Sequence, residues 1–252
     1  MAKRLFFNSL FFNRLAFSGM LLLSKSLLAA SPVPFNSAYE VKVFGGLNAE
    51  AELALNKLGE GEYEMQAMVK LSFFKKTLTQ ANASSKLSWH LNETLPQSYE
   101  YIQTGMGHHS NSIIYDWEKH LATTRVDDEE SVLPLDTAML DELSMYVEIQ
   151  QQAAEGVEDI HLNVIDADKI KQYHYKRVAE EQLETPLGVF NTVKYLRVRS
   201  PDSKRVTELW LASDWGYLVL QLKQKTRIRT FQINLHHASV NGEAVDPLNS
   251  SD

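Results

Sequence analysis

Histidines are the side chains of this sequence best suited to hold a metal ion or to move protons near neutral pH. A zinc site on a single helix needs H-x-x-x-H or H-E-x-x-H spacing, and neither occurs in the chain. Adjacent histidines on a strand, such as His236 and His237, point to opposite faces and do not easily share one ion. We therefore predict no metal site and no cofactor. The histidines are His90, His108, His109, His120, His161, His174, His236 and His237.

No motif of a known catalytic class accompanies these histidines. Ser72-Phe73-Phe74-Lys75 has the S-x-x-K spacing of penicillin-binding enzymes, but it ends an alternating segment and lacks the S-D-N and K-T-G partners. Residues 127–130 form an acidic run without the glycine and alternating oxygen ligands of a calcium loop, so we interpret it as a solvated loop. The sequence also lacks G-x-S-x-G, a P-loop and G-x-G-x-x-G. We predict a protein without catalytic activity; a hydrolase with a dispersed site stays an alternative, because such groups meet only in three dimensions.

Aromatic side chains are the strongest indication of binding. Large amphipathic rings line apolar pockets while their polar ends reach a ligand or water, although the same rings also fill the core of a sheet. Both interpretations remain open at this point. The predicted ligand-binding residues are Trp89, Tyr99, Tyr101, Trp117, Trp210 and Tyr217.

The elements that would position these rings are strands. Apolar residues alternate with polar ones over residues 47–55 and 63–73, which places one side of each strand in a core and the other in water. Gly45-Gly46 and Gly59-Glu60-Gly61 separate successive strands as turns. We predict a mainly β protein, a strongly curved antiparallel sheet or open half-barrel of about ten to twelve strands. The other predicted strands cover residues 84–91, 98–105, 111–117, 120–126, 160–165, 171–180, 188–199, 205–213, 217–226 and 228–238.

One segment has helical rather than strand periodicity. Apolar residues recur at intervals of three and four between residues 137 and 153, Asp136 is placed to cap the start, and Gly156 follows the end. We predict an amphipathic helix over about 137–153 that packs a Leu143/Val147 stripe on the sheet.

The first 30 residues differ from the remainder. Lys3, Arg4 and Arg14 precede an apolar run that ends at Ala30, before Ser31-Pro32, which is the layout of a secretory signal peptide. We predict a cleaved signal over residues 1–30, a single domain over 31–252 and a periplasmic location. An uncleaved signal would be the only contact with a membrane, and an ordinary helix is the remaining alternative.

Charge and composition exclude several classes of protein. The chain has 25 basic and 32 acidic residues; four of the basic and none of the acidic residues lie in the first 30, so removal of that segment leaves a net charge of −11. An acidic domain with no dense basic stripe repels phosphate backbones, so we predict no nucleic-acid partner. The absence of cysteine excludes disulfides and thiol chemistry.

Several short motifs resemble the DUF3108 family of exported bacterial proteins, whose function is unassigned. They are Ala38-Tyr39, Gly46, residues 95–99, Tyr101, residues 114–117, 140–144, 181–188 and 209–214. The resemblance covers about residues 38–237 and implies periplasmic residence and a curved sheet, with no catalytic residue. It marks Asp116, Trp117, Glu181, Gly188, Trp210 and Asp214 as structural motif residues. More loosely, the layout is similar to the half-barrels of lipoprotein carriers of the LolA and LolB type, which hold acyl chains.

From the residues themselves, Gly188 would supply the positive φ of a tight turn after Pro186-Leu187. Asp116 and Asp214 would accept turn amides beside their tryptophans, and Glu181 is expected at the surface rather than inside.

These observations support two main functions. The first is a periplasmic binding or carrier module for an apolar or amphipathic, lipid-like ligand. The second is a cell-envelope module that interacts with another protein, for which an exposed apolar patch or an unprotected strand edge would be evidence.

Overall fold

The computed structural model describes residues 31–42, 47–73, 76–136, 138–228 and 230–248. The predicted signal segment, the Gly45-Gly46 turn and part of the S-x-x-K motif lie outside these residues. Within them the chain forms 16 strands of one sheet and one helix, so the mainly β prediction is confirmed and the predicted strand number was too low. No helix in the described part of the chain is long and apolar enough to span a membrane.

The elements follow one another as hairpins around the helix. They are β1 (Phe35–Lys42), β2 (Leu47–Gly59), β3 (Glu62–Phe73), β4 (Lys76–His90), β5 (Glu93–Gly105), β6 (His109–Asp116), β7 (Leu121–Val126), β8 (Glu129–Pro134), β9 (Met139–Leu140), α1 (Ser144–Ala154), β10 (Asp159–Asp166), β11 (Lys169–Thr185), β12 (Gly188–Val198), β13 (Val206–Ala212), β14 (Leu218–Lys225), β15 (Thr230–Val240) and β16 (Glu243–Ala244).

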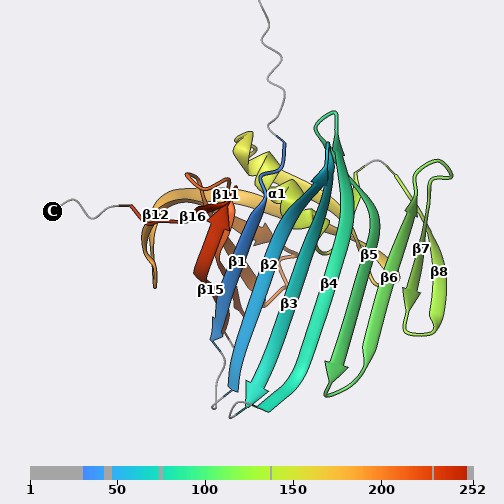
Figure 1. Ribbon diagram of the computed structural model, residues 1–252, viewed down its shortest axis with the longest axis horizontal. Helices are drawn as coiled ribbons and strands as arrows, with labels where there is room; N and C mark the ends of the chain where they lie inside the picture. The colour runs from blue at the N-terminus through green and yellow to red at the C-terminus, as the bar shows by residue number, and fades with distance from the viewer. Residues whose placement is uncertain (1–30, 43–46, 74–75, 137, 229, 249–252) are drawn as a thin grey trace, which may run out of the picture.

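The sheet is open and curved. Its strand order is β8-β7-β6-β5-β4-β3-β2-β1-β15-β14-β13-β12-β11-β10-β9, with β16 paired to β15, and only the β9–β10 pair is parallel. β1 to β8 form one wall, and β11 and β12 pass behind it across α1 (Figure 1). Register shifts mark several pairs, among them β1–β15 at Ala38/Tyr39 and β13–β14 at Trp210/Leu211. Such bulges increase local twist and bend, which lets a sheet this wide curve back on itself.

The helix is buried on two sides inside this curve. Leu143 and Val147 pack on the wall of β1 to β7, as predicted, in a core with Tyr63 and Leu87. Ile149, with Met145 and Ala153, packs in a second core against β10 to β13. We call the face of the sheet that contacts α1 the inner face and the opposite one the outer face. The helix therefore packs between the wall of β1 to β8 and the opposing strands β10 to β13, and it holds these two parts of the sheet together.

The predicted helix start was wrong. Met139–Leu140 form strand β9, and Ala138 has a positive φ of 60°, a left-handed conformation that an α-helix cannot contain. Asp136 therefore caps nothing, and α1 begins at Ser144. Gly156 has φ 79° and ends the helix as predicted, its amide donating to the carbonyl of Ala153.

Three short strands were missed. β8 occupies the second half of the acidic run that we interpreted as a solvated loop, because Asp127, with φ 51°, turns the chain back on β7. β9 and β16 have two residues each, too few for an alternation to be visible. Glu129, Glu130 and Pro134 lie on the free edge strand β8, and charged and proline residues there oppose pairing with another chain.

Gly188 occupies a position that only glycine fits. Its φ is 131°, and a Cβ built on it would lie 2.6 Å from Cβ and 2.8 Å from Cγ of Pro247. The predicted need for a positive φ is confirmed, and close approach of the C-terminal segment adds to it.

We expect Gly188→Ala to lower the free energy of unfolding by about 2 kcal/mol or more, since it adds backbone strain and a clash. Gly242→Ala is the matched control, with φ 84° but nothing within 4 Å of the added Cβ, and should cost only about 1 kcal/mol. Urea denaturation measures both. If the Pro247 contact matters, Pro247→Gly should recover part of the Gly188→Ala loss; equal effects of the two alanine variants would contradict this explanation.

Candidate functional site

A buried carboxylate fixes the start of the helix to the sheet. Asp141 has no exposed surface, and its Oδ1 accepts hydrogen bonds from the amides of Leu143 at 2.9 Å and Ser144 at 2.8 Å. Its Oδ2 accepts one from the hydroxyl of Ser85 on β4, at 2.7 Å. The Asp141 amide donates to the Ser144 hydroxyl at 2.8 Å. Burial raises the pKa of Asp141 and outweighs these hydrogen bonds, which lower it.

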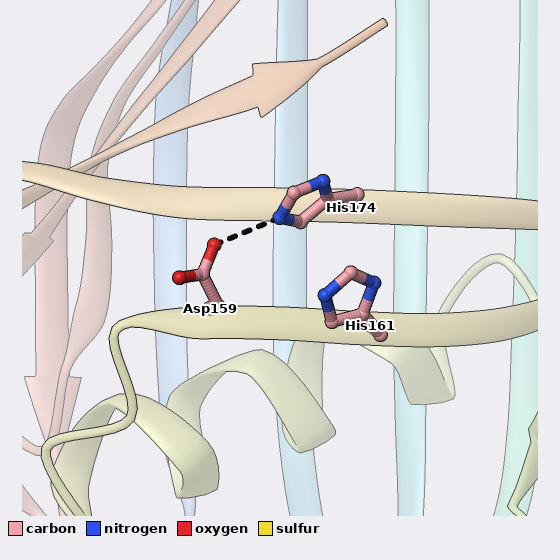
Figure 2. Close-up of side chains that lie close together, drawn as sticks. All are labelled: Asp159, His161 and His174. Carbon is pink, nitrogen blue, oxygen red and sulfur yellow. Dashed lines mark hydrogen bonds and ion pairs between the residues drawn. The ribbon is translucent and has the colours of Figure 1, made fainter.

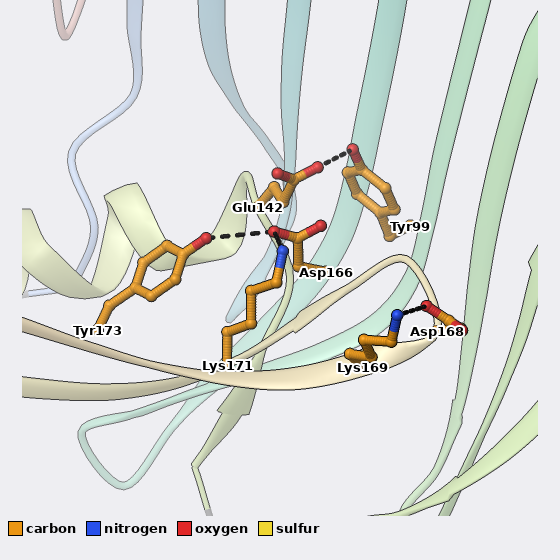
Figure 3. Close-up of polar contacts among 7 residues, drawn as sticks. All are labelled: Tyr99, Glu142, Asp166, Asp168, Lys169, Lys171 and Tyr173. Carbon is orange, nitrogen blue, oxygen red and sulfur yellow. Dashed lines mark hydrogen bonds and ion pairs between the residues drawn. The ribbon is translucent and has the colours of Figure 1, made fainter. Parts of the chain in front are cut away.

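A second polar group lies where the β10–β11 hairpin approaches the wall (Figure 3). The Tyr99 hydroxyl lies 3.4 Å from Glu142, the Tyr173 hydroxyl lies 3.3 Å from Asp166, and Lys171 pairs with Asp166. Partial desolvation, followed by the negative charge of Asp166, raises the pKa of Glu142. The first contact joins β5 to the segment before α1, the other two lie within the hairpin, and a depression of about 200 Å³ lies beside them.

A serine nucleophile would be recognised by a hydrogen bond between its hydroxyl and a histidine. In the described residues no serine hydroxyl makes such a bond, and the histidines pair with carboxylates instead, among them His174 with Asp159 at 2.9 Å and His109 with Asp127 at 3.6 Å. Asp127 there accepts the backbone amide of Ser110, not its hydroxyl. A nucleophile with an adjacent base is the geometric requirement for covalent hydrolysis. The dispersed-hydrolase alternative thus finds no support here.

The inner face of the wall changes from buried to exposed along its strands. Met65 and Leu87 are fully buried beside α1. One register row further, Leu53, Ala67, Ala83 and Tyr101 are half-buried.

Beyond this row the inner side chains of β3 are exposed, although Ala51 of β2 and Tyr39 and Val41 of β1 stay buried. Val69 is 44% and Phe73 40% exposed, and both continue the alternation of Tyr63 and Met65. In Figure 1 the strands of the wall extend well beyond α1 at this end. An apolar inner surface is thus exposed on β3 and β4, with small side chains such as Ala81 around it.

Basic side chains meet at the same end of the sheet. The strand register places the ends of β1, β3 and β14 together with the starts of β4, β13 and β15, since Lys42 pairs with Gln232 and Lys225 with both Thr230 and Val206. We call this the open end.

A depression of about 700 Å³ lies between the β12–β13 and β14–β15 loops at the open end. Arg199, Lys204, Arg205 and Arg227 line it, and none of them has an acidic partner among the ion pairs of the described residues. One guanidinium nitrogen of Arg199 is buried without a hydrogen-bond partner. Burial and then the positive charge of Arg197 lower the pKa of Arg199. A crowded set of unpaired guanidinium groups is a site that favours an anion.

Comparison with known proteins identifies the family of the chain. A family model described as a protein of unknown function (DUF3108) matches residues 38–235. The chain belongs to the DUF3108 family. A search of curated proteins finds no match.

The crystal structure of a beta-barrel-like protein of the domain of unknown function DUF1849, from Brucella abortus, is similar to this DUF3108 protein with a TM-score of 0.56. The match covers 84% of this chain and 99% of that chain at 8% identity, so the likeness is one of fold alone. Neither comparison points to catalysis.

The DUF3108 motif residues have structural contacts. Asp116 accepts the Lys119 amide at 3.0 Å, the turn role that we predicted, whereas Asp214 accepts the side-chain amide of Asn191 at 2.8 Å. Glu181 is exposed, as expected, and accepts the Trp210 indole N–H at 2.7 Å.

The six predicted ligand-binding aromatics are not in one pocket. Tyr99 and Tyr101 share the inner face of β5, close to the exposed apolar surface. Trp117 stacks on Tyr115 and donates to the Pro96 carbonyl, while Trp89 packs on the same core.

The remaining two rings lie elsewhere in the fold. Trp210 is buried under Lys194, whose Nζ lies 4.5 Å from the ring centroid, on the face of β13 away from α1. Tyr217 packs on the second core from a turn with φ 56°.

The depression around Arg199 is not predicted by the sequence. Residues 197–205 hold four basic residues in nine, and Lys223, Lys225 and Arg227 alternate in the segment that ends β14. Each segment alone is too short for a basic stripe, and only the register brings both to one end. Nor does the sequence predict Ser85 as the partner of Asp141, because 56 residues separate them.

The Asp141 contacts lead to a pH prediction. A carboxyl whose folded pKa is raised destabilises the fold progressively as pH rises above its unfolded value of 3.8. We expect Asp141→Asn to keep the hydrogen-bond geometry and to remove this dependence, so its stability relative to the natural protein improves from pH 4 upward. Asp141→Ala leaves three donors without an acceptor and should lose roughly 3 kcal/mol.

Urea denaturation of the two variants and the natural protein at several pH values tests this expectation. If the difference in the free energy of unfolding between Asp141→Asn and the natural protein does not change with pH, folding does not raise the pKa of Asp141 and this explanation is contradicted.

Proposed function

We propose that this protein is a periplasmic, non-catalytic binding or carrier module for an amphipathic, lipid-like ligand with an anionic headgroup. The observation that carries the proposal is the pairing, at one open end of a curved sheet, of an exposed apolar inner surface with a cluster of unpaired basic side chains. The apolar surface would contact the acyl chain of such a ligand, and the basic side chains would contact its headgroup.

The apolar half suits an acyl chain. Val69 and Phe73 are large apolar side chains exposed on the inner face of the sheet, and the half-buried residues behind them continue into the core. Removing apolar surface from water is favourable by roughly 25 cal/mol per Å², so a chain laid along this surface gains by covering it. Alanine side chains at positions 67, 81 and 83 leave room above the strands.

The basic half suits a phosphate or carboxylate headgroup. Arginine binds such groups through paired, charge-assisted hydrogen bonds, and Arg199 already has a buried N–H group without a partner. Ile228, 86% exposed, and Phe231, 40% exposed, follow Arg227 at the start of β15. Ile233, half-buried, continues this apolar series along β15 and pairs with the buried Val41 of β1, so apolar residues extend from the side of the basic depression to the inner face.

Two further features agree with this proposal. The lipoprotein carriers of the LolA and LolB type also surround a helix with a curved sheet, but fold analogy does not fix function. The periplasmic location rests on the layout of the first 30 residues, and N-terminal sequencing of the protein recovered from cells would test it.

An envelope protein-interaction module is the second candidate, and one observation favours it. An open depression of about 530 Å³ lies on the outer face across β15 and β1 to β5, with Ala54, Met68 and Ser84 in its lining. Strand addition at β8 is opposed by the charged edge described above. A partner would therefore dock on the outer face and leave the inner surface free.

Two neighbouring residues of β3 separate these functions, because Val69 faces inward and Met68 outward. We expect Val69→Glu to weaken binding of a fluorescent phosphatidylglycerol at least tenfold, since a carboxylate would meet the acyl chain. Arg199→Glu should do the same by repelling the headgroup. Met68→Glu is the matched control and should leave the affinity unchanged.

Lipid extraction and native mass spectrometry of the purified protein complete this test. Failure of the natural protein to bind the probe saturably, or equal loss in Met68→Glu, would contradict the inner-surface proposal. Loss of a co-purified envelope protein in Met68→Glu alone would favour the second candidate.

A further inference from the structure

Three potential metal ligands meet on the outer side of the β10–β11 hairpin (Figure 2). Asp159 and His161 are two residues apart on β10, so their side chains leave the same face of the strand. His174 of β11 pairs directly with His161. The intervening and neighbouring apolar residues, Ile160 and Tyr173, are buried on the opposite face.

The ligand atoms are already close together. One atom from each residue lies within 4.8 Å of the other two. The Oδ1 atom of Asp159 is 2.9 Å from Nε2 of His174, and the two imidazole rings stack with centroids 4.1 Å apart. Ligands about 2.0–2.1 Å from a tetrahedral zinc ion lie about 3.3 Å from one another, so small side-chain rotations would complete the geometry.

We propose that Asp159, His161 and His174 bind one divalent transition-metal ion, with Zn²⁺ as the ion that best fits the donors. Two imidazole nitrogens and a carboxylate oxygen are donors that zinc, copper and nickel accept, whereas calcium and magnesium prefer oxygen alone. Three protein ligands leave a fourth position for water or an external ligand. This site lies apart from the apolar inner surface and does not depend on the proposed lipid binding.

The local charges permit the site. Aspartate carboxylates carry a negative charge near neutral pH, so Asp159 supplies one charge that favours a cation. Lys176 pairs with Asp159 across the hairpin and is the nearby cation that opposes a second positive charge. Lys176 is exposed, and its flexible side chain can turn into solvent as the ion enters.

Other histidine–carboxylate pairs in the described chain do not reach three ligands. His109 with Asp127 and His236 with Glu40, each at 3.6 Å, offer two ligands apiece. They serve as internal comparisons, since they share the chemistry of the Asp159 cluster without its third donor.

Isothermal titration of the untagged, chelator-treated protein with Zn²⁺ tests the proposal. We expect one saturable site, weakened at least tenfold by His161→Ala, by His174→Ala and by Asp159→Asn. His236→Ala is the matched control and should titrate like the natural protein. Titration with Co²⁺ gives a second readout, the visible absorption of a bound ion with nitrogen ligands.

Circular dichroism of each variant confirms that an altered titration does not reflect unfolding, because all three residues project from the outer face. Absence of a stoichiometric site in the natural protein would overturn the proposal. So would a site that keeps its affinity in both His161→Ala and His174→Ala, or one that His236→Ala removes.

Discussion

The position of a single helix within the curved sheet determines the remainder of the molecule, and a buried carboxylate determines that position. Asp141 joins the amides that begin α1 to the Ser85 hydroxyl of β4, so the helix cannot slide along the wall without leaving charged and polar atoms unpaired in a dry interior. Its two apolar sides then complete two cores, one against each wall. An ionisable group in such a place is costly, and its contribution here is to fix one arrangement among several that the apolar contacts alone would allow.

This placement divides the inner face into two parts. Beside the helix, Tyr63, Met65 and Leu87 are covered and stabilise the fold. Beyond it, Val69 and Phe73 continue the same alternation but remain exposed, at the same end of the sheet as the loops that carry Arg199 and Arg205. A sheet that had only to be stable would end where the helix ends or become polar there. The continued apolar pattern, together with basic groups that have no acidic partners within the described part of the chain, is the physical basis for the proposal that this end of the molecule binds an anionic amphiphile.

Features that depend on neighbouring residues along the chain, such as strands and their inner-facing positions, could be predicted from the sequence. Features that depend on contacts between distant residues, such as the exposure of a side chain or the start of the helix, could not. Alternation at Tyr63 and Met65 predicted strands and inner-facing positions, but it could not show that Val69 is uncovered, since this depends on the length of α1 relative to β3. Asp136 precedes the predicted helix and Asp141 lies inside it. The left-handed Ala138 and the contact with Ser85 place Asp141, and not Asp136, at the start of the observed helix. The Asp159 cluster could have been found, because a turn between the predicted strands 160–165 and 171–180 places His161 opposite His174.

Photo-crosslinking with a phosphatidylglycerol that carries a diazirine near the end of one acyl chain tests the central claim most directly. Neighbouring residues of β3 face opposite sides of the sheet, so peptide mapping at single-residue resolution distinguishes the two faces. The account predicts adducts on inner-face residues such as Val69, Leu71 and Ala81, and few on Met68 and Lys70. Adducts concentrated on Met68 and Ile102 of the outer face, or none above the level of a non-lipid diazirine, would contradict it.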